Sequence, residues 1–150
     1  MAACVPRAAR AFYGFSPDLP PCAGLAPQEQ VERLRVWGQT AVFGGYERPD
    51  FVEVARSAGL AVYAEFAVFQ GEHWWQELPA SRPITASGEP LQPEGWYHGL
   101  NPALPILHQR RLADLERFLS HYDLDGVWLD FIRWPGHWEV RAPHLPLTSF

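Results

Sequence analysis

Hydrophobic positions along this chain follow two alternating spacings. Short runs in which most residues are apolar predict strands, and the segments between them carry apolar residues at every third or fourth position, which predicts amphipathic helices. A proline near the start of each helical segment and a glycine after the first two support these boundaries. The predicted strands are residues 10–15, 40–43, 60–69 and 125–135, and the predicted helices are residues 27–37, 49–58 and, from Pro102 or Pro105, a helix to residue 122.

The succession of strand, helix and strand is that of βαβ units, which build parallel sheets with right-handed crossovers. The third predicted strand is apolar on both faces, as buried parallel strands are. Four such strands fit half of an eight-stranded (β/α) barrel or a small open sheet, and a complete barrel needs about 250 residues. Since the chain has 150 residues, we predict an α/β fold in which residues 1–9 form a leader and residues 10–150 form the N-terminal four-strand portion of a TIM barrel. We therefore expect a fragment of a longer domain.

Composition and charge narrow the choice of partners. The apolar fraction of 47% and the charged fraction of 19% are those of a folded globular protein. The net charge is −5 and the chain has no basic run, so we predict neither nucleic acid nor a membrane as partner. No signal-peptide core precedes Pro17. This predicts a cytoplasmic protein as the chain stands, and a secreted protein if the natural start lies upstream.

Residues 71–102 interrupt the βα succession with a proline- and tryptophan-rich segment that has neither a helical nor a strand period. A long loop of this kind is usually functional, and in a parallel barrel function gathers at the C-terminal ends of the strands. Five of the seven tryptophans follow the third and fourth predicted strands, where they would either stack on sugar rings or pack the loops onto the barrel rim. The predicted aromatic binding residues are Tyr63, Trp74, Trp75, Trp96, Tyr97, Trp128, Trp134 and Trp138.

Asp130 is the sharpest candidate for chemistry. It lies near the end of the fourth predicted strand among apolar neighbours, where a buried carboxylate is costly unless a partner or a function compensates. Pointing into the barrel mouth, it would act as a nucleophile or as an electrostatic stabiliser of an oxocarbenium-like transition state. The alternative is a structural carboxylate paired with Arg133 or with backbone N–H groups.

Glu65 occupies the equivalent position on the third predicted strand and shares a face with Tyr63. Neighbouring strands lie about 4.8 Å apart, so we expect Glu65 and Asp130 to form a carboxylate pair that divides the acid and base roles. The alternative is that Glu65 only contacts substrate or orients Arg133.

Arg133 and Glu139 complete the predicted substrate-binding set. Arg133 would bind an anion or orient Asp130, and the alternative is a plain surface salt bridge. Glu139 would reach the ligand from a rim loop, and the alternative is a solvated charge. The histidines lack the spacing of a metal-binding motif, and the two cysteines have the spacing of neither a metal site nor a disulfide framework. We therefore predict no metal and no cofactor.

The run DGVWLDFIRWP at residues 125–135 resembles the GVHLDYIRYP type of motif in hypothetical glycoside-hydrolase-like families. These are bacterial TIM-barrel proteins distantly similar to α-amylase-type and family 10-like glycosyl hydrolases. The segment at residues 62–66 is also similar, and the resemblance covers residues 10–139. It implies a barrel fold and the role of nucleophile for Asp130. In such proteins a later strand usually supplies the general acid, and this chain departs from them in ending before it.

The residues and the resemblance together predict a glycoside-hydrolase-like enzyme that hydrolyses a glycosidic bond in an oligo- or polysaccharide. Two alternatives remain open. One is a non-catalytic carbohydrate-binding protein that uses the same tryptophans. The other is an inactive partial barrel, whose two unpaired sheet edges would favour self-association.

Overall fold

The computed structural model describes residues 9–134, except residues 86 and 94. These residues form two compact units. The first unit comprises residues 9–66 and 114–129, and the second unit comprises residues 67–113 and 130–134.

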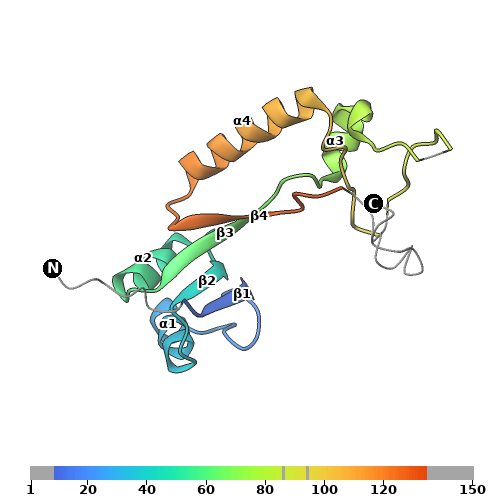
Figure 1. The fold of residues 1–150 in the computed structure, drawn as a ribbon. Coiled ribbons are helices and arrows are strands. Elements are labelled where there is room, and N and C mark those ends of the chain that lie inside the picture. The colour runs from blue at the N-terminus through green and yellow to red at the C-terminus, as the bar shows by residue number, and fades with distance from the viewer. Residues whose placement is uncertain (1–8, 86, 94, 135–150) are drawn as a thin grey trace. The chain divides into compact units, whose positions relative to one another are not determined.

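The chain alternates strands and helices along most of its length (Figure 1). The predicted order of strands and helices is confirmed, and each of the three predicted helices begins at a proline, as the sequence indicates. The elements are β1 (Ala11–Phe15), α1 (Pro27–Val36), β2 (Ala41–Gly44), α2 (Pro49–Ser57), β3 (Ala61–Ala67), α3 (Glu72–Glu77), a 3-10 turn (Pro79–Ser81), α4 (Pro105–His121) and β4 (Gly126–Asp130).

Two predictions differ from the structure by more than one or two residues at an element's end. The fourth strand ends at Asp130 instead of continuing toward Pro135, because Phe131 adopts a left-handed backbone conformation with φ +53°. The segment 71–102 was predicted to lack helical structure, and this was wrong for α3. A helix of six residues is shorter than two turns, so it leaves no period in the sequence to detect.

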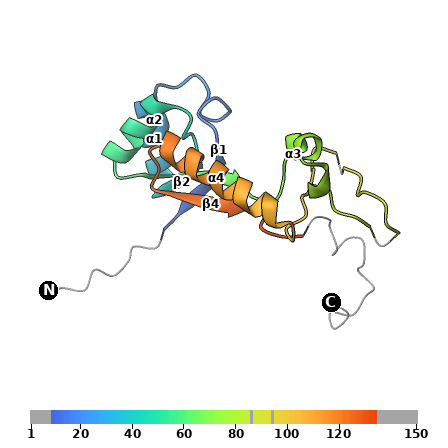
Figure 2. The same cartoon turned by 90° about the horizontal axis from the view of Figure 1, so that it is seen from above.

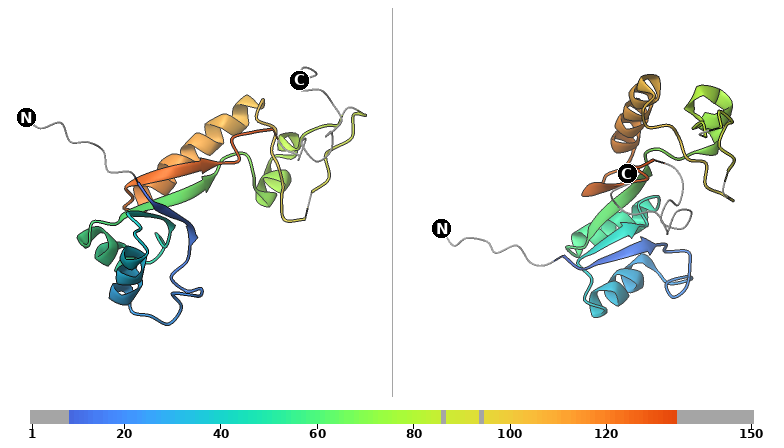
Figure 3. Two further views of the ribbon diagram at one scale, coloured as in Figure 1. Left: turned by 60° about the horizontal axis from the view of Figure 1, so that its bottom comes forward. Right: turned by 45° about the vertical axis from the view of Figure 1, so that its right-hand side comes forward.

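The four strands form one sheet in the order β1-β2-β3-β4. β1 pairs with β2 and β2 with β3 in parallel, with Ala11 beside Ala41 and Val42 beside Val62. The right-hand view of Figure 3 shows the four strands in this order. An α/β fold with four parallel strands, consistent with part of a barrel, is thus confirmed.

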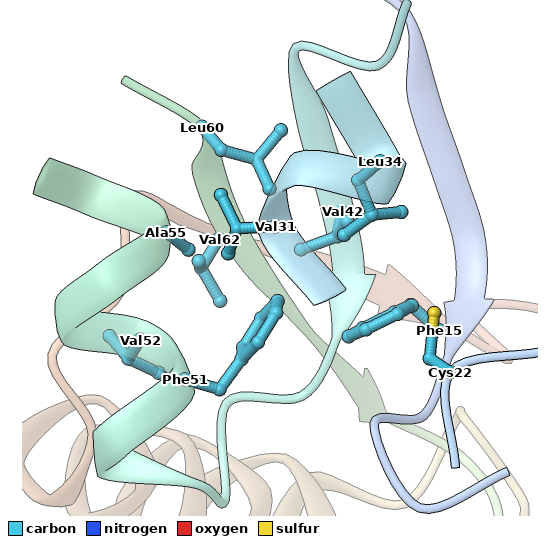
Figure 4. Packing of buried hydrophobic residues seen from close by; sticks show 10 residues of the cluster. All are labelled: Phe15, Cys22, Val31, Leu34, Val42, Phe51, Val52, Ala55, Leu60 and Val62. Carbon is cyan, nitrogen blue, oxygen red and sulfur yellow. The ribbon is translucent and has the colours of Figure 1, made fainter. Parts of the chain in front are cut away.

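The core of the first unit lies between the sheet and the helices α1 and α2, which pack side by side (Figure 2). Each helix contributes residues three or four positions apart, Val31 with Leu34 and Phe51 with Ala55, so that one face of each is buried. Figure 4 shows this cluster of buried residues, which consists of Phe15, Cys22, Val31, Leu34, Val42, Phe51, Val52, Ala55, Leu60 and Val62.

Two glycines of this unit lie where a Cβ atom would be too close to a neighbour. Gly44 ends β2 with φ +124°, and a Cβ atom there would lie 2.0 Å from the Phe15 carbonyl oxygen. A Cβ atom on Gly126 would lie 2.6 Å from the ring of Tyr63. The first glycine lets β1 and β2 approach at their carboxyl ends, and the second makes room for an aromatic ring on the sheet.

The second unit has its own small core. The indoles of Trp74 and Trp75 are buried against Leu100 and Leu107, with Phe69, Leu78 and Leu104 at its margin. Side chains also bind backbone here: Trp75 Nε1 donates to the Gly99 carbonyl at 3.0 Å, and Ser81 Oγ donates to the Trp74 carbonyl at 3.1 Å. Trp74 and Trp75 therefore anchor the start of the proline-rich segment in this core.

Among the residues described, no helix combines the length and the apolar character that crossing a bilayer requires.

Candidate active site

Asp130 is the last residue of β4 and belongs to the second unit. Its carbonyl accepts a hydrogen bond from the Val68 N–H at 2.9 Å, and the Phe131 carbonyl accepts one from the Phe69 N–H at 3.2 Å. The backbone that follows β3 thus holds the backbone at the end of β4. Asp130 lies at the carboxyl end of a parallel strand, where barrel enzymes carry their catalytic groups.

The backbone turns sharply after Asp130. Phe131 has φ +53°, a conformation that costs a residue with a bulky side chain roughly 1–3 kcal/mol. The Phe131 N–H donates to Asp130 Oδ1 at 2.6 Å, so the carboxylate itself binds the first amide of the turn. Strained residues of this kind persist only where the surrounding structure fixes them, and they are concentrated at functional sites.

Aromatic rings and a guanidinium surround this turn. We call Trp96, Tyr97, Phe131 and Arg133 the aromatic cluster. Tyr97 stacks on Phe131 with ring centroids 5.4 Å apart, and Trp96 meets the Phe131 ring edge-on at 5.9 Å. The Arg133 guanidinium lies 5.9 Å from the centroids of both Tyr97 and Phe131. The sequence predicts Trp96, Tyr97 and Arg133 as substrate-binding residues. Their rings and charge lie around Phe131, the residue after Asp130, and their binding role stays a prediction.

The two aromatic residues from the proline-rich segment differ in exposure. Tyr97 is buried at 6% exposure, whereas Trp96 is 71% exposed. Their position is set where the segment returns to β3: Gly71 N–H donates to the His98 carbonyl at 3.1 Å, and Leu100 N–H donates to the Phe69 carbonyl at 2.9 Å. Tyr97 is therefore the base of the aromatic cluster, and Trp96 offers a ring face to solvent.

The phenol of Tyr97 is sensitive to the charges around it. Burial raises its pKa above the usual value, the positive charge of Arg133 opposes the rise, and the negative charge of Asp130 adds to it. Both charges thus act on one buried phenol, which ties Asp130 to the aromatic cluster electrostatically as well as through the backbone.

The remaining predicted residues of the second unit lie in three situations. Trp74 and Trp75 are buried in its core, with the Arg82 guanidinium 4.4 Å from the Trp75 ring centroid, so packing accounts for them. Trp134 is 62% exposed. Trp138 and Glu139 lie outside the described residues.

Glu65, Tyr63 and Trp128 belong to the first unit. The Tyr13 hydroxyl donates to Glu65 Oε2 at 2.6 Å. Burial alternates along β3, so that Tyr63 and Glu65 share the face opposite the helices, as predicted. The ring of Phe43 connects this face, stacking on Tyr63 at 5.0 Å and meeting Trp128 edge-on at 5.7 Å.

The pairing of Glu65 with Asp130 joins residues of the two units and stays a prediction. Sequence reasoning missed Phe43 as part of the aromatic face on the first unit. Its signal was the parallel register, which puts Phe43 level with both Tyr13 and Tyr63. The conformation of Phe131 had no signal, because it is neither glycine nor asparagine.

Acidic residues of the described chain do not gather around a metal site: no group of three or more His, Cys, Asp or Glu side chains there is arranged to hold an ion. Asp125 instead closes the start of β4 onto β3. Its Oδ2 accepts from the Val62 N–H at 2.8 Å, and Arg56 lies 3.6 Å from its Oδ1.

Two solved structures are similar to this chain. A noncanonic maltogenic alpha-amylase, AmyB, from Thermotoga neapolitana aligns with a TM-score of 0.59 and 13% identity over 84% of this chain and 39% of its own. A hypothetical protein from Ruminiclostridium thermocellum ATCC 27405 aligns with a TM-score of 0.62 and 12% identity over 85% of this chain and 78% of its own.

No protein-family model matches the sequence, and no curated protein matches it either. This chain spans 39% of the length of the amylase. At identities of 12–13% the likeness shows the fold alone: this chain shares its α/β fold with both structures.

Proposed function

We propose that this chain carries a carbohydrate-processing site of the glycoside-hydrolase type, with Asp130 as the carboxylate that acts on the sugar. The observation that carries the proposal is the position of Asp130 at the carboxyl end of β4, before a strained turn and beside the aromatic cluster. The fold supports it because parallel barrels hold their active sites at this end of the strands.

Each neighbour of Asp130 has a chemical use in this reaction. A carboxylate next to the anomeric carbon stabilises the positive charge of an oxocarbenium-like transition state or attacks it as a nucleophile. The exposed ring of Trp96 offers an apolar face for the C–H groups of a sugar ring. Arg133 supplies hydrogen-bond donors for sugar hydroxyls or for an acidic sugar.

Linear α-glucans are the first substrates to test, because a protein named as a maltogenic alpha-amylase shares the fold. The experiment compares the wild type with Asp130→Asn on maltooligosaccharides and on a panel of chromogenic glycosides. Loss of the catalytic carboxylate lowers kcat/KM by about 100-fold or more.

The matched control is Asp123→Asn, which makes the same chemical change at an exposed carboxylate of the first unit, paired with Arg56. Its activity should equal that of the wild type. An Asp130→Asn protein with full activity on a substrate that the wild type hydrolyses would contradict the proposal.

A second candidate function is carbohydrate binding without catalysis, which the 71% exposure of Trp96 favours. It predicts saturable quenching of tryptophan fluorescence by oligosaccharides and no turnover. Replacement of Trp96 by alanine would weaken that binding by about 1–3 kcal/mol if a sugar ring stacks on it as bases stack on aromatic side chains. Turnover by the wild type would exclude this second function.

A further inference from the structure

A guanidinium from α4 holds the carboxyl end of β3. Arg111 lies in the part of α4 that belongs to the second unit. Its Nε donates to the Val68 carbonyl at 2.8 Å, and one terminal nitrogen donates to the Ala67 carbonyl. The guanidinium also lies 5.7 Å from the centroid of the Trp74 ring. A partly buried charged side chain is thus bound to two backbone carbonyls.

These two carbonyls lie beyond the last regular hydrogen bonds between the strands of the sheet. In a regular parallel pair, a residue that donates to one strand position accepts from the position two residues further on. Val68 donates to Asp130, so its carbonyl would accept from residue 132 if β4 continued. The turn at Phe131 ends that register, and the next hydrogen bond runs from the Phe69 N–H to the Phe131 carbonyl instead.

The other neighbour of β3 also stops early. β2 pairs with β3 only as far as Phe43 beside Tyr63, so Ala67 lies beyond the end of β2. Backbone carbonyls in a partly buried position need donors, and the planar fork of one arginine can serve two of them at once. Arg111 therefore supplies donors to two carbonyls at the β3 terminus that lie beyond the paired part of the strand.

The backbone that Arg111 binds is the backbone that holds Asp130. Val68 and Phe69 donate to the carbonyls of Asp130 and Phe131, and the Phe69 carbonyl accepts from the Leu100 N–H. Arg111 therefore binds the backbone segment to which Asp130 and Phe131 are hydrogen-bonded. The same segment binds Leu100, at the end of the segment that carries Tyr97.

We propose that Arg111 is the positioning residue for Asp130: it fixes residues 67–69, which in turn fix the strained turn that aims the carboxylate. The catalytic consequence rests on the proposed function of Asp130. The positioning itself is measurable without substrate.

The test uses the full chain with Arg111→Met and Arg111→Lys, and Arg110→Met as the matched control. Arg110 is the adjacent residue of α4, is exposed, and has its guanidinium 5.9 Å from the same Trp74 ring. Within the described part of the chain it has no hydrogen bond to β3. The control therefore removes a comparable cation–ring contact and leaves the carbonyls of Ala67 and Val68 bound.

The first readout is amide hydrogen exchange. In Arg111→Met, exchange at the Val68 and Phe69 amides should rise by about tenfold or more, as expected for a locally opened segment. The Ala61 amide, which donates to the Thr40 carbonyl at 3.0 Å in the first unit, should keep its rate, and Arg110→Met should change none of these. The second readout is kinetic: on a hydrolysed glycoside, kcat should fall by about tenfold or more while KM stays nearly constant.

Each result decides a separate point. Unchanged exchange at Val68 and Phe69 in Arg111→Met would overturn the positioning role, whatever the activity. Faster exchange with unchanged kcat would overturn its link to catalysis. If exchange is faster in Arg111→Met but the wild type hydrolyses no glycoside, the positioning role stands and the proposed function is refuted. If Arg111→Met does not fold, Arg111→Lys carries the test, because lysine keeps the charge without the fork; wild-type exchange in that variant would overturn the proposal.

Discussion

Different kinds of contact stabilise the two units of this chain, each within itself. In the first unit, two helices each place one apolar face on a parallel sheet, and ten buried residues form a continuous core. Among the described residues of the second unit, the buried core has four members, two of them tryptophans. Side chains there bind backbone directly, as Trp75, Ser81 and Arg111 do. The first unit has the larger apolar core, and in the second unit side-chain-to-backbone hydrogen bonds accompany a smaller core.

This difference has a functional side. Apolar packing is non-directional and spreads its energy over many weak contacts. Directed hydrogen bonds fix a backbone in one conformation, and the strained Phe131 needs such fixing. The candidate site belongs to the second unit, where the backbone is held in this way. The comparison between the units can be tested by mutations whose expected effects differ in size.

The largest effect is expected at the centre of the first unit. Phe51 is completely buried and its ring packs 4.9 Å from that of Phe15. Replacement of Phe51 by alanine should lower the free energy of unfolding by about 3–5 kcal/mol, the range for a large-to-small change in a core. Urea denaturation followed by circular dichroism measures it. A cost below about 1 kcal/mol would show that packing does not dominate this unit.

A smaller effect is expected where polar contacts close β4 onto β3. In Asp125→Ala the Val62 N–H loses its acceptor at 2.8 Å, which should cost about 1–3 kcal/mol. The matched control is Asp123→Ala, since Asp123 also pairs with Arg56 but has a side chain that is 80% exposed. An exposed ion pair contributes about 0–1 kcal/mol. Equal losses in the two variants, measured by urea denaturation, would contradict the role assigned to Asp125.

The directed contacts of the second unit are tested by Trp75→Phe. Phenylalanine keeps an aromatic ring in the core but cannot donate to the Gly99 carbonyl, and the loss should be about 0.5–1.5 kcal/mol. The change should appear mainly as faster exchange at the Leu100 amide, close to the lost contact. Faster exchange at Ala61 in the first unit would mean that the two units do not open separately.

The same difference decides what the sequence could predict. The strands and helices of the first unit follow from periodic apolar positions, proline starts and glycine ends, so their order was predictable from local patterns alone. Asp130 could be singled out as a candidate because a carboxylate stands out in an apolar strand, and its role stays a prediction. The turn at Phe131, the burial of Trp74 and the hydrogen bonds of Arg111 depend on contacts between distant segments, and no spacing in the sequence encodes them.

The smallest predicted effect concerns the Tyr97 phenol. Its pKa is raised above 10.0 by burial, lowered by Arg133 and raised by Asp130. Asp130→Asn should therefore lower this pKa, and Arg133→Met should raise it further. The phenolate absorbance of each variant, titrated with pH and corrected by the same variant carrying Tyr97→Phe, gives the two shifts. Shifts of opposite sign would support the placement of both charges around this ring.

The raised pKa also has a consequence for stability. The folded protein keeps the Tyr97 proton at pH values where the unfolded chain releases it, so the free energy of unfolding should fall as the pH rises above about 10. Tyr97→Phe removes this group and should make the fall less steep than in the wild type. Since burial also raises the pKa of Tyr46, Tyr46→Phe serves as the control in the first unit. If only Tyr46→Phe flattens the curve, burial of Tyr97 in the second unit is too loose to perturb its proton, and the base of the aromatic cluster is open to water.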